Sequence, residues 1–235
     1  MDGRAAVEVD DLQLVGERRP ADELAPGAAA RVEREGVEQV WQAVAALGRP
    51  VDALCLNAGR GAGGEFVGGT PLTDELEIVD LNVRSTVHLA KYVVRDMTAL
   101  GEGRILFTSS IASTMPGTYQ AVYNASKSFT QSFALALREE LSDTGVTVTS
   151  LMPGPTETEF FERANLEGTM LGETSMKDDA ATVAKQGFEG LMAGKERVEA
   201  GSLMSKIQGR MSRFIPDAVK AKAHSKIAEP GAKSS

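Results

Sequence analysis

VDALCLNAG (51–59) is the stretch from which the fold follows. It is a short apolar run that ends in an Asn-Ala-Gly turn signal, as a fully buried strand of a parallel sheet does. The residues before it, GVEQVWQAVAAL (36–47), have apolar side chains at helical spacing, and Gly48 and Pro50 then favour the end of a helix. A helix that leads into a buried strand is one repeat of a parallel α/β sheet.

The same alternation continues toward the C-terminus. A long helix is predicted with Thr73 as its N-cap. Its apolar stripe consists of Leu76, Val79, Val83, Val87, Ala90, Val94 and Met97. RILFTSS (104–110) and VTVTSLMPGP (146–155) resemble buried strands with a helix between them, and a helix near 178–193 and a strand near 197–200 complete the pattern. These units predict an α/β fold, a Rossmann-like doubly wound parallel sheet with helices on both faces.

The two ends of the chain differ from this core. Residues 1–35 are rich in charged and small residues and form a divergent N-terminal segment in which only AVEVDDLQLV (6–15) could be a strand. The catalytic core is expected at 36–205, and a C-terminal helix and flexible tail at 206–235. A chain of 235 residues fits one domain with such appendages.

Composition and charge exclude several classes of function. The net charge of −8 and the pI near 5.0 argue against binding to nucleic acid or to anionic membranes. No apolar run approaches the roughly 18 residues of a membrane span, and the acidic N-terminus has no apolar signal-peptide core. The only cysteine, Cys55, excludes an internal disulfide and fits a cytoplasmic location. With only His88 and His224 besides, no His/Cys metal site is expected.

Polar residues gather where the predicted strands end. In doubly wound folds ligands bind beyond the carboxyl ends of the strands, and these ends carry Asn57-Ala58-Gly59, Ser109-Ser110 and Pro153-Gly154-Pro155-Thr156. Tyr123 and Lys127, four residues apart in YNASK, share one face of the following helix. A hydroxyl to hold a substrate oxygen, a phenol to exchange its proton and a cation to lower the phenol's pKa would suit a carbonyl/alcohol reaction.

These motifs resemble the short-chain dehydrogenase/reductase family. The matching residues are NAG (57–59), YNASK as Y-x-x-x-K, Ser110 at the family's distance before the tyrosine (123 − 13 = 110), and PGPTET (153–158). DLNVRSTVHLAK (80–91) is similar to a family helix whose asparagine falls on Asn82. The resemblance covers roughly residues 36 to 200, and the order and spacing of the motifs make it specific.

The resemblance implies a role for each matching residue. The catalytic residues would be Ser110, which holds the substrate carbonyl, Tyr123, the general acid and base, Lys127, which depresses the tyrosine's pKa, and Asn82, which anchors a proton-relay water. The cofactor-binding residues would be Asn57, Ala58 and Gly59 beside the adenine ribose, Tyr123 and Lys127 at the nicotinamide ribose, and Pro153, Gly154, Thr156 and Thr158 at the nicotinamide and phosphate side. Ser109 lacks the family spacing and is expected to be structural.

Cofactor and partners follow from the same resemblance. The cofactor would be NAD or NADP, and the substrate a small carbonyl compound or alcohol. The long helix predicted at 74–98 and the YNASK helix resemble the family's dimer-forming pair, which implies a homodimer or homotetramer. No metal and no nucleic acid is expected.

One family feature is absent from the sequence. The glycine-rich turn T-G-x-x-x-G-x-G, whose helix N-terminus receives the cofactor's pyrophosphate, has no counterpart in the first 50 residues. Gly59, Gly61 and Gly64 match G-x-G-x-x-G formally, but no helix starts directly after them, so they are interpreted as a flexible rim of the active site. We therefore expect a shortened or internally started member that lacks part or all of the first βαβ half. The open edge of the strand at 51–57 would then be covered in part by residues 6–15.

Two main functions stay open at this stage. One is an NAD(P)-dependent oxidoreductase that acts through Ser110, Tyr123 and Lys127. The other is a catalytically impaired descendant that keeps these residues but binds dinucleotide weakly or not at all. A hydrolase has little support, because the sequence has no G-x-S-x-G elbow and no histidine near the serines.

Overall fold

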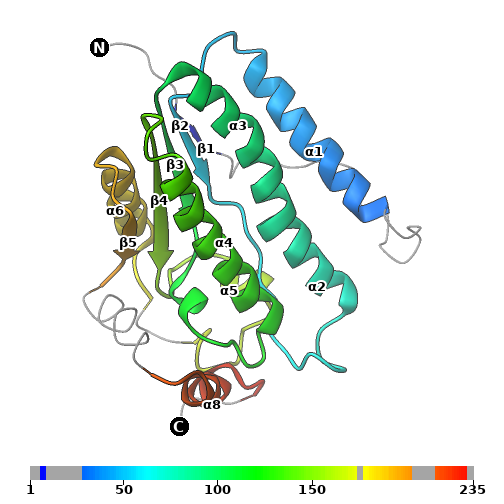
Figure 1. The fold of residues 1–235 in the computed structure, drawn as a ribbon. Helices are drawn as coiled ribbons and strands as arrows, with labels where there is room; N and C mark the ends of the chain where they lie inside the picture. Colours follow the sequence, from blue (N-terminus) through cyan, green and yellow to red (C-terminus); the bar gives the residue numbers. More distant parts are fainter. Residues whose placement is uncertain (1–5, 9–27, 174–176, 203–214, 232–235) are drawn as a thin grey trace.

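A parallel sheet with the strand order β1-β2-β3-β4-β5 forms the centre of the molecule (Figure 1). We describe residues 6–8, 28–173, 177–202 and 215–231 of a computed structural model of the chain, with side chains from residue 35 onward. The strands are β1 (Ala6–Glu8), β2 (Ala53–Leu56), β3 (Gly103–Thr108), β4 (Val146–Pro153) and β5 (Arg197–Ala200). All neighbouring strands pair in parallel, which confirms the predicted α/β class.

Strand β1 pairs with the outer edge of β2, which was predicted to be open apart from partial cover by residues 6–15. Ala6 pairs with Ala53 and Glu8 with Cys55, so β1 lies parallel beside β2. The prediction that residues 6–15 cover this edge is confirmed for 6–8, and residues 9–15 lie outside the described part. Pairing satisfies β2 backbone groups that would otherwise be free to bind another chain.

Helices cover both faces of the sheet. One face carries α1 (Ala28–Ala45), α3 (Thr86–Leu100) and α4 (Ala121–Glu140), and α6 (Ala180–Met192) covers the other (Figure 1). The larger core lies under the first group and includes Leu54, Ile105, Phe107, Val148, Val93, Met97 and Ala134. The smaller core under α6 includes Leu106, Leu151, Val183 and Leu191. Both faces of the central strands are therefore apolar, as continuous hydrophobic runs in parallel strands require.

Shorter elements gather beyond the carboxyl ends of the strands. They are the 3₁₀-helix η3 (Ile111–Thr114), α5 (Phe160–Arg163) and the C-terminal helix α8 (Asp217–Ala228). Figure 1 shows α8 across this end of the sheet, beyond the arrowhead of β4. The predicted C-terminal helix is therefore present, whereas residues 232–235 of the predicted tail lie outside the described part. Among the described residues, no helix is long and apolar enough to cross a membrane.

The long helix after residue 71 differs from its prediction. It consists of α2 (Leu72–Val79), a π-helical segment η2 (Asp80–Ser85) and α3. Its N-cap is Pro71, and not Thr73 as predicted. The buried face consists of Glu75, Ile78, Asn82, Thr86, Leu89, Ala90, Val93 and Met97. Because a π-helix holds more residues per turn, the four-residue steps from Ile78 to Ala90 stay on one face, and much of the predicted stripe, including Leu76, Val79 and Val87, is exposed.

The other predicted elements agree with the structure apart from their ends. Helix α1 begins at Ala28, before the predicted start at 36, so regular structure extends into the segment expected to be divergent. Helix α6 and strand β5 lie within two residues of their predicted ends, which is the normal uncertainty of helix and strand boundaries.

Candidate active site

Tyr123 and Lys127 lie on the inner face of α4, directly beyond the end of β3. Both are buried, with 9% and 6% of their surface exposed. Lys127 Nζ donates to the carbonyl of Thr108 at 2.9 Å, and the Ser109 hydroxyl donates to the carbonyl of Lys127 at 2.9 Å. The Lys127 Nζ atom is 6.0 Å from the centroid of the Tyr123 ring. The end of β3 thus fixes the first turns of α4 and places both side chains at the carboxyl edge of the sheet.

Ser110 is next to Tyr123, although twelve residues separate them in the sequence. Its hydroxyl lies close enough to the Tyr123 phenol to lower the pKa of the phenol, and it accepts a hydrogen bond from the Ala112 N–H at 3.1 Å as the N-cap of η3. Ser109 is buried and donates to backbone on α4, while its N–H bonds the carbonyl of Leu151. Of the two serines, Ser110 is the one in contact with the tyrosine.

Asn82 joins the loop after β2 to α4. Its Oδ1 accepts from the Arg60 N–H, and its Nδ2 donates to the Arg60 carbonyl and to the Ser126 hydroxyl, each at 2.9 Å. Ser126 in turn donates to the carbonyl of Tyr123 at 2.7 Å. Asn82 therefore connects the NAG loop to the backbone of the tyrosine, and its predicted role in holding a water stays a prediction.

Gly59 leaves room beside the lysine. A Cβ added at Gly59 would lie 3.1 Å from Lys127 Nζ and 3.3 Å from Asn82 Oδ1, and the residue itself is exposed. Lys127 has three N–H donors, and the Thr108 carbonyl takes one of them. Space next to an ammonium group with donors to spare fits the nicotinamide ribose that the resemblance implies for Lys127, whereas the adenine ribose that it implies for Asn57, Ala58 and Gly59 stays a prediction.

The residues after β4 lie at the same end of the sheet. Pro153 is the last residue of β4, and the Gly154 N–H reaches the carbonyl of Ala200 at 3.4 Å. The Thr156 hydroxyl donates to the Gly154 carbonyl at 3.0 Å, and the Thr158 hydroxyl accepts from the Phe160 N–H at 3.4 Å. Both hydroxyls thus bond within their own segment, and their predicted contact with a cofactor stays a prediction.

Burial controls the protonation of the pair. Desolvation raises the pKa of Tyr123 to about 12, although its hydrogen bond with Ser110 partly counteracts this, and desolvation lowers the pKa of Lys127 to about 8. The tyrosine shift is opposite in direction to the sequence-based expectation, because removing the phenol from water disfavours phenolate. At neutral pH the phenol therefore keeps its proton.

The glycine-rich stretch after β2 is packed against another segment and is not the flexible rim that the sequence suggested. A Cβ on Gly61 would come within 2.7 Å of the Phe160 ring, and one on Gly63 would collide with Leu166. The Gly63 N–H bonds the carbonyl of Ala164 at 2.7 Å. These glycines allow the loop to approach the α5 segment closely.

Three residues at the site were missed by the sequence reasoning. The Phe160 ring lies against that of Tyr123, with centroids 5.1 Å apart, and shields the phenol from water. Asn124 and Ser126 are buried; Asn124 donates to the carbonyl of Ala112 in η3, and Ser126 accepts from Asn82 in η2. Both lie inside YNASK, so the motif itself marks them, but nothing in the pattern indicates their partners.

Comparison with known proteins identifies the family. A family model described as short chain dehydrogenase matches residues 18–168. The NADP-dependent 3-hydroxy acid dehydrogenase of Salmonella typhi is 31% identical over 121 residues, covering 52% of this chain and 49% of that protein. Serine 3-dehydrogenase of Rhizobium radiobacter is 34% identical over 112 residues, covering 48% and 45%. The chain thus spans about half the length of these relatives.

A solved structure shows the same fold. The short chain dehydrogenase from Burkholderia cenocepacia in complex with NADP has a TM-score of 0.65 at 20% identity, and the match covers 82% of this chain and 76% of that one. The family match extends over more than half of the chain and includes the strand ends that carry Asn57, Ser110 and Pro153 and the helix that carries Tyr123. The chain belongs to the short-chain dehydrogenase family.

Proposed function

We propose that this protein is an NAD(P)-dependent oxidoreductase that interconverts a carbonyl and an alcohol through Ser110, Tyr123 and Lys127. The observation that carries the proposal is that Ser110 and Tyr123 lie next to each other, beside a buried Lys127, at the carboxyl edge of a parallel sheet. Membership of the family supports it, as do the relatives whose names state a dependence on NADP.

The three side chains would divide the proton chemistry. Ser110 would hold the substrate oxygen, and Tyr123 would give it a proton in reduction or take one in oxidation. Because the pKa of Tyr123 is about 12, the phenol holds its proton at neutral pH and is ready to act as the acid. Lys127 would bind ribose hydroxyls with its remaining donors and stabilise phenolate once it forms.

The cofactor supplies the hydride when it is bound. Asn57, Ala58 and Gly59 would hold it on one side, and Pro153, Gly154, Thr156 and Thr158 on the other. These segments follow β2 and β4, which lie on either side of β3, so both would face the space next to Ser110 and Tyr123.

The first test is binding of the cofactor. The lack of a glycine-rich turn in the first 50 residues favours the alternative of an impaired descendant that keeps the site but binds dinucleotide weakly. Titration of the purified chain with NADH and NADPH, followed by nicotinamide fluorescence, separates the two functions. Saturable binding supports the oxidoreductase, and no binding up to millimolar cofactor overturns it.

The second test removes the proton-transfer group. Tyr123→Phe should lower turnover of model ketones by about 10²-fold or more, the usual contribution of a general acid, while cofactor binding stays nearly unchanged. Tyr92→Phe on α3 is the matched control, because Tyr92 stacks on Trp41 away from the site. Turnover that survives Tyr123→Phe would refute the role of the phenol.

We also propose that two copies pair through an apolar groove between α2, η2 and α4. The groove has a volume of about 350 Å³ and is lined by Val79, Val83, Ala121, Val122, Ala125, Ser126 and Phe129. Val79 and Phe129 expose 37% and 39% of their surface, which is costly in water unless a partner covers them. A second copy of the chain is the proposed partner, because the long helix after residue 71 and the YNASK helix resemble the family's dimer-forming pair.

Light scattering tests the assembly. Val79→Glu should reduce the mass to that of a monomer, because a carboxylate in an apolar interface stays desolvated and unpaired. Leu47→Glu, at an exposed apolar residue after α1, should leave the mass unchanged. A wild-type monomer at micromolar concentration would rule out the pairing.

A further inference from the structure

The segment between Ser110 and Tyr123 has little regular structure of its own. After Ser110 the chain makes the single 3₁₀ turn η3 and then continues through Pro116, Gly117 and Thr118 to the start of α4. One short turn cannot hold its shape by its own hydrogen bonds. The position of Ser110 relative to Tyr123 therefore depends on the residues that fix this segment from outside.

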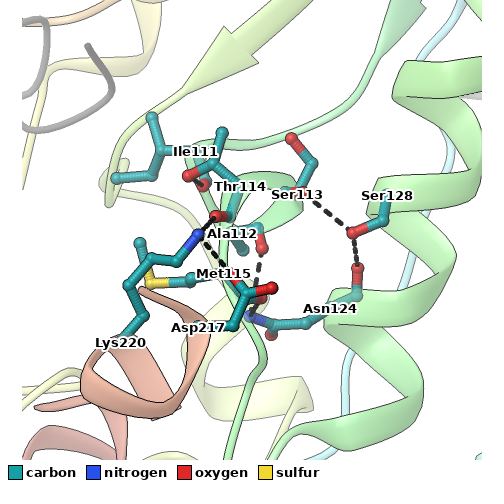
Figure 2. Close-up of polar contacts among 9 residues, drawn as sticks. All are labelled: Ile111, Ala112, Ser113, Thr114, Met115, Asn124, Ser128, Asp217 and Lys220. Atoms are coloured by element: carbon teal, nitrogen blue, oxygen red, sulfur yellow. Dashed lines mark hydrogen bonds and ion pairs between the residues drawn. The ribbon is translucent and has the colours of Figure 1, made fainter. Parts of the chain in front are cut away.

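Asn124 and Ser128 hold the segment from α4. The Asn124 Nδ2 donates to the carbonyls of Ala112 and Met115, each at 3.1 Å, and only 2% of the residue is exposed. One turn further along α4, the Ser128 hydroxyl lies 2.9 Å from the carbonyl of Ser113 and 2.9 Å from that of Asn124, and it shares its proton between them. Figure 2 shows both side chains reaching from α4 toward η3.

Lys220 holds the same segment from α8. Its Nζ donates to the carbonyl of Thr114 at 2.7 Å and pairs with Asp217 at 2.6 Å, and its side chain is 11% exposed (Figure 2). The contact joins residues 106 positions apart. Further along α8, the His224 Nδ1 is 2.9 Å from the carbonyl of Thr118, whose hydroxyl donates to the carbonyl of Ala221. Because a carbonyl only accepts, the His224 proton lies on Nδ1.

Every backbone carbonyl from Ser110 to Met115 accepts a hydrogen bond. Ser110 and Ile111 are satisfied within the turn, by Ser113 and by the Thr114 hydroxyl. The Ala112 carbonyl accepts from the Met115 N–H within the turn and also from Asn124. The carbonyls of Ser113, Thr114 and Met115 accept only from side chains of α4 and α8 among the described residues. Removal of one of these donors leaves a carbonyl without its protein partner and frees the turn to shift.

We propose that Asn124 and Lys220 are positioning residues that set Ser110 against Tyr123. This inference rests on the proposed function, because it concerns how the hydroxyl groups of Ser110 and Tyr123 align on one substrate oxygen. Neither residue touches the reacting atoms. The C-terminal helix α8 is thereby part of the active-site architecture, since a displacement of about 1 Å in a reacting group can cost about 10²-fold in rate.

The sharpest variant is Lys220→Met, which keeps the stem and removes the donor. Lys220→Arg restores a donor, and Lys222→Met is the matched control on the exposed side of α8. Hydrogen–deuterium exchange on the cofactor-free protein should be at least about tenfold faster across residues 111–119 in Lys220→Met and unchanged in Lys222→Met. If exchange is unchanged in Lys220→Met, Lys220 does not hold residues 111–119 in place, whether or not the protein is an enzyme.

Kinetics then test the positioning role. In Lys220→Met we expect kcat for a model ketone to fall about 10- to 100-fold, with NADPH affinity unchanged and with Lys220→Arg recovering most of the rate. If Lys220→Met exchanges faster but keeps its kcat, Lys220 is a structural contact and not a positioning residue. If wild type has no turnover, the proposed function fails, but the exchange experiment still shows whether Lys220 holds residues 111–119 in place. Asn124→Asp, which exchanges a donor for an acceptor, should reproduce both effects from the α4 side.

Discussion

The five side chains of YNASK (123–127) face three different surroundings. Tyr123 and Lys127 face the edge of the sheet with Ser110, whereas Asn124 bonds the η3 segment and Ser126 accepts from Asn82 on η2. Ala125 lines the apolar groove on the outside. Because a helix turns by about 100° per residue, consecutive residues necessarily serve different neighbours. The motif therefore combines the proposed catalytic pair with the bonds that hold it in place.

Lys127 should make stability depend on pH. Its pKa is 10.5 in an unfolded chain and about 8 in the folded protein, so between these values the folded state binds fewer protons and stability rises with pH. From pH 8 to pH 10.5, the free energy of unfolding of wild type should rise by about 2–3 kcal/mol relative to that of Lys127→Met. Denaturant unfolding at several pH values measures it.

The control for this prediction is Lys91→Met on the exposed side of α3. Its stability should run parallel to that of wild type over the same range. Tyr123 acts above this window and in the opposite direction, because its raised pKa lowers stability as the pH rises from 10 to about 12. Parallel curves for wild type and Lys127→Met would contradict the buried ammonium.

Among the elements, α5 determines the surroundings of the tyrosine. Phe160, its first residue, packs on the Tyr123 ring and on Gly61, and Phe161 packs edge-on against Phe160. This short helix has no strong signal in the sequence, since four residues cannot show periodicity. Its position results from contacts with the glycine-rich loop after β2.

Removal of the Phe160 ring should lower the pKa of Tyr123. In Phe160→Ala, water reaches the phenol, and the pKa should move from about 12 toward the ordinary value of 10. The measurement is phenolate absorbance after a rapid pH jump, with Tyr123→Phe as the reference that assigns the signal among the three tyrosines. Phe129→Ala, at an exposed ring on α4, should leave the titration unchanged.

The π-helical segment explains why one element was predicted with the wrong face. Helical periodicity places Val79 and Val87 on an apolar stripe, yet they lie outside, while Asn82 is buried between the NAG loop and α4. The hydrogen bonds of Asn82 to Arg60 and Ser126 offset the cost of burying an amide. Such long-range partners cannot be found from spacing alone.

At the scale of the whole molecule, ligand binding should stabilise the fold. If NADPH binds only the folded state, a concentration 100 times its Kd adds about 2.7 kcal/mol, which for a chain of this size raises the melting temperature by roughly 5–10 °C. Lys127→Met should show a clearly smaller rise at the same concentration, because it lacks the donors proposed for the ribose. An equal rise in both proteins would contradict that contact.

The sequence by itself determined the order of strands and helices, the parallel sheet and the residues at the strand ends. These properties are local, because periodicity, turn residues and motif spacing act within a few turns of chain. Only the tertiary structure decided that Phe160 shields Tyr123, that Asn82 joins Arg60 to Ser126 and that Lys220 reaches Thr114 across 106 positions. Contacts between distant segments depend on how their surfaces fit, and no local pattern encodes that fit.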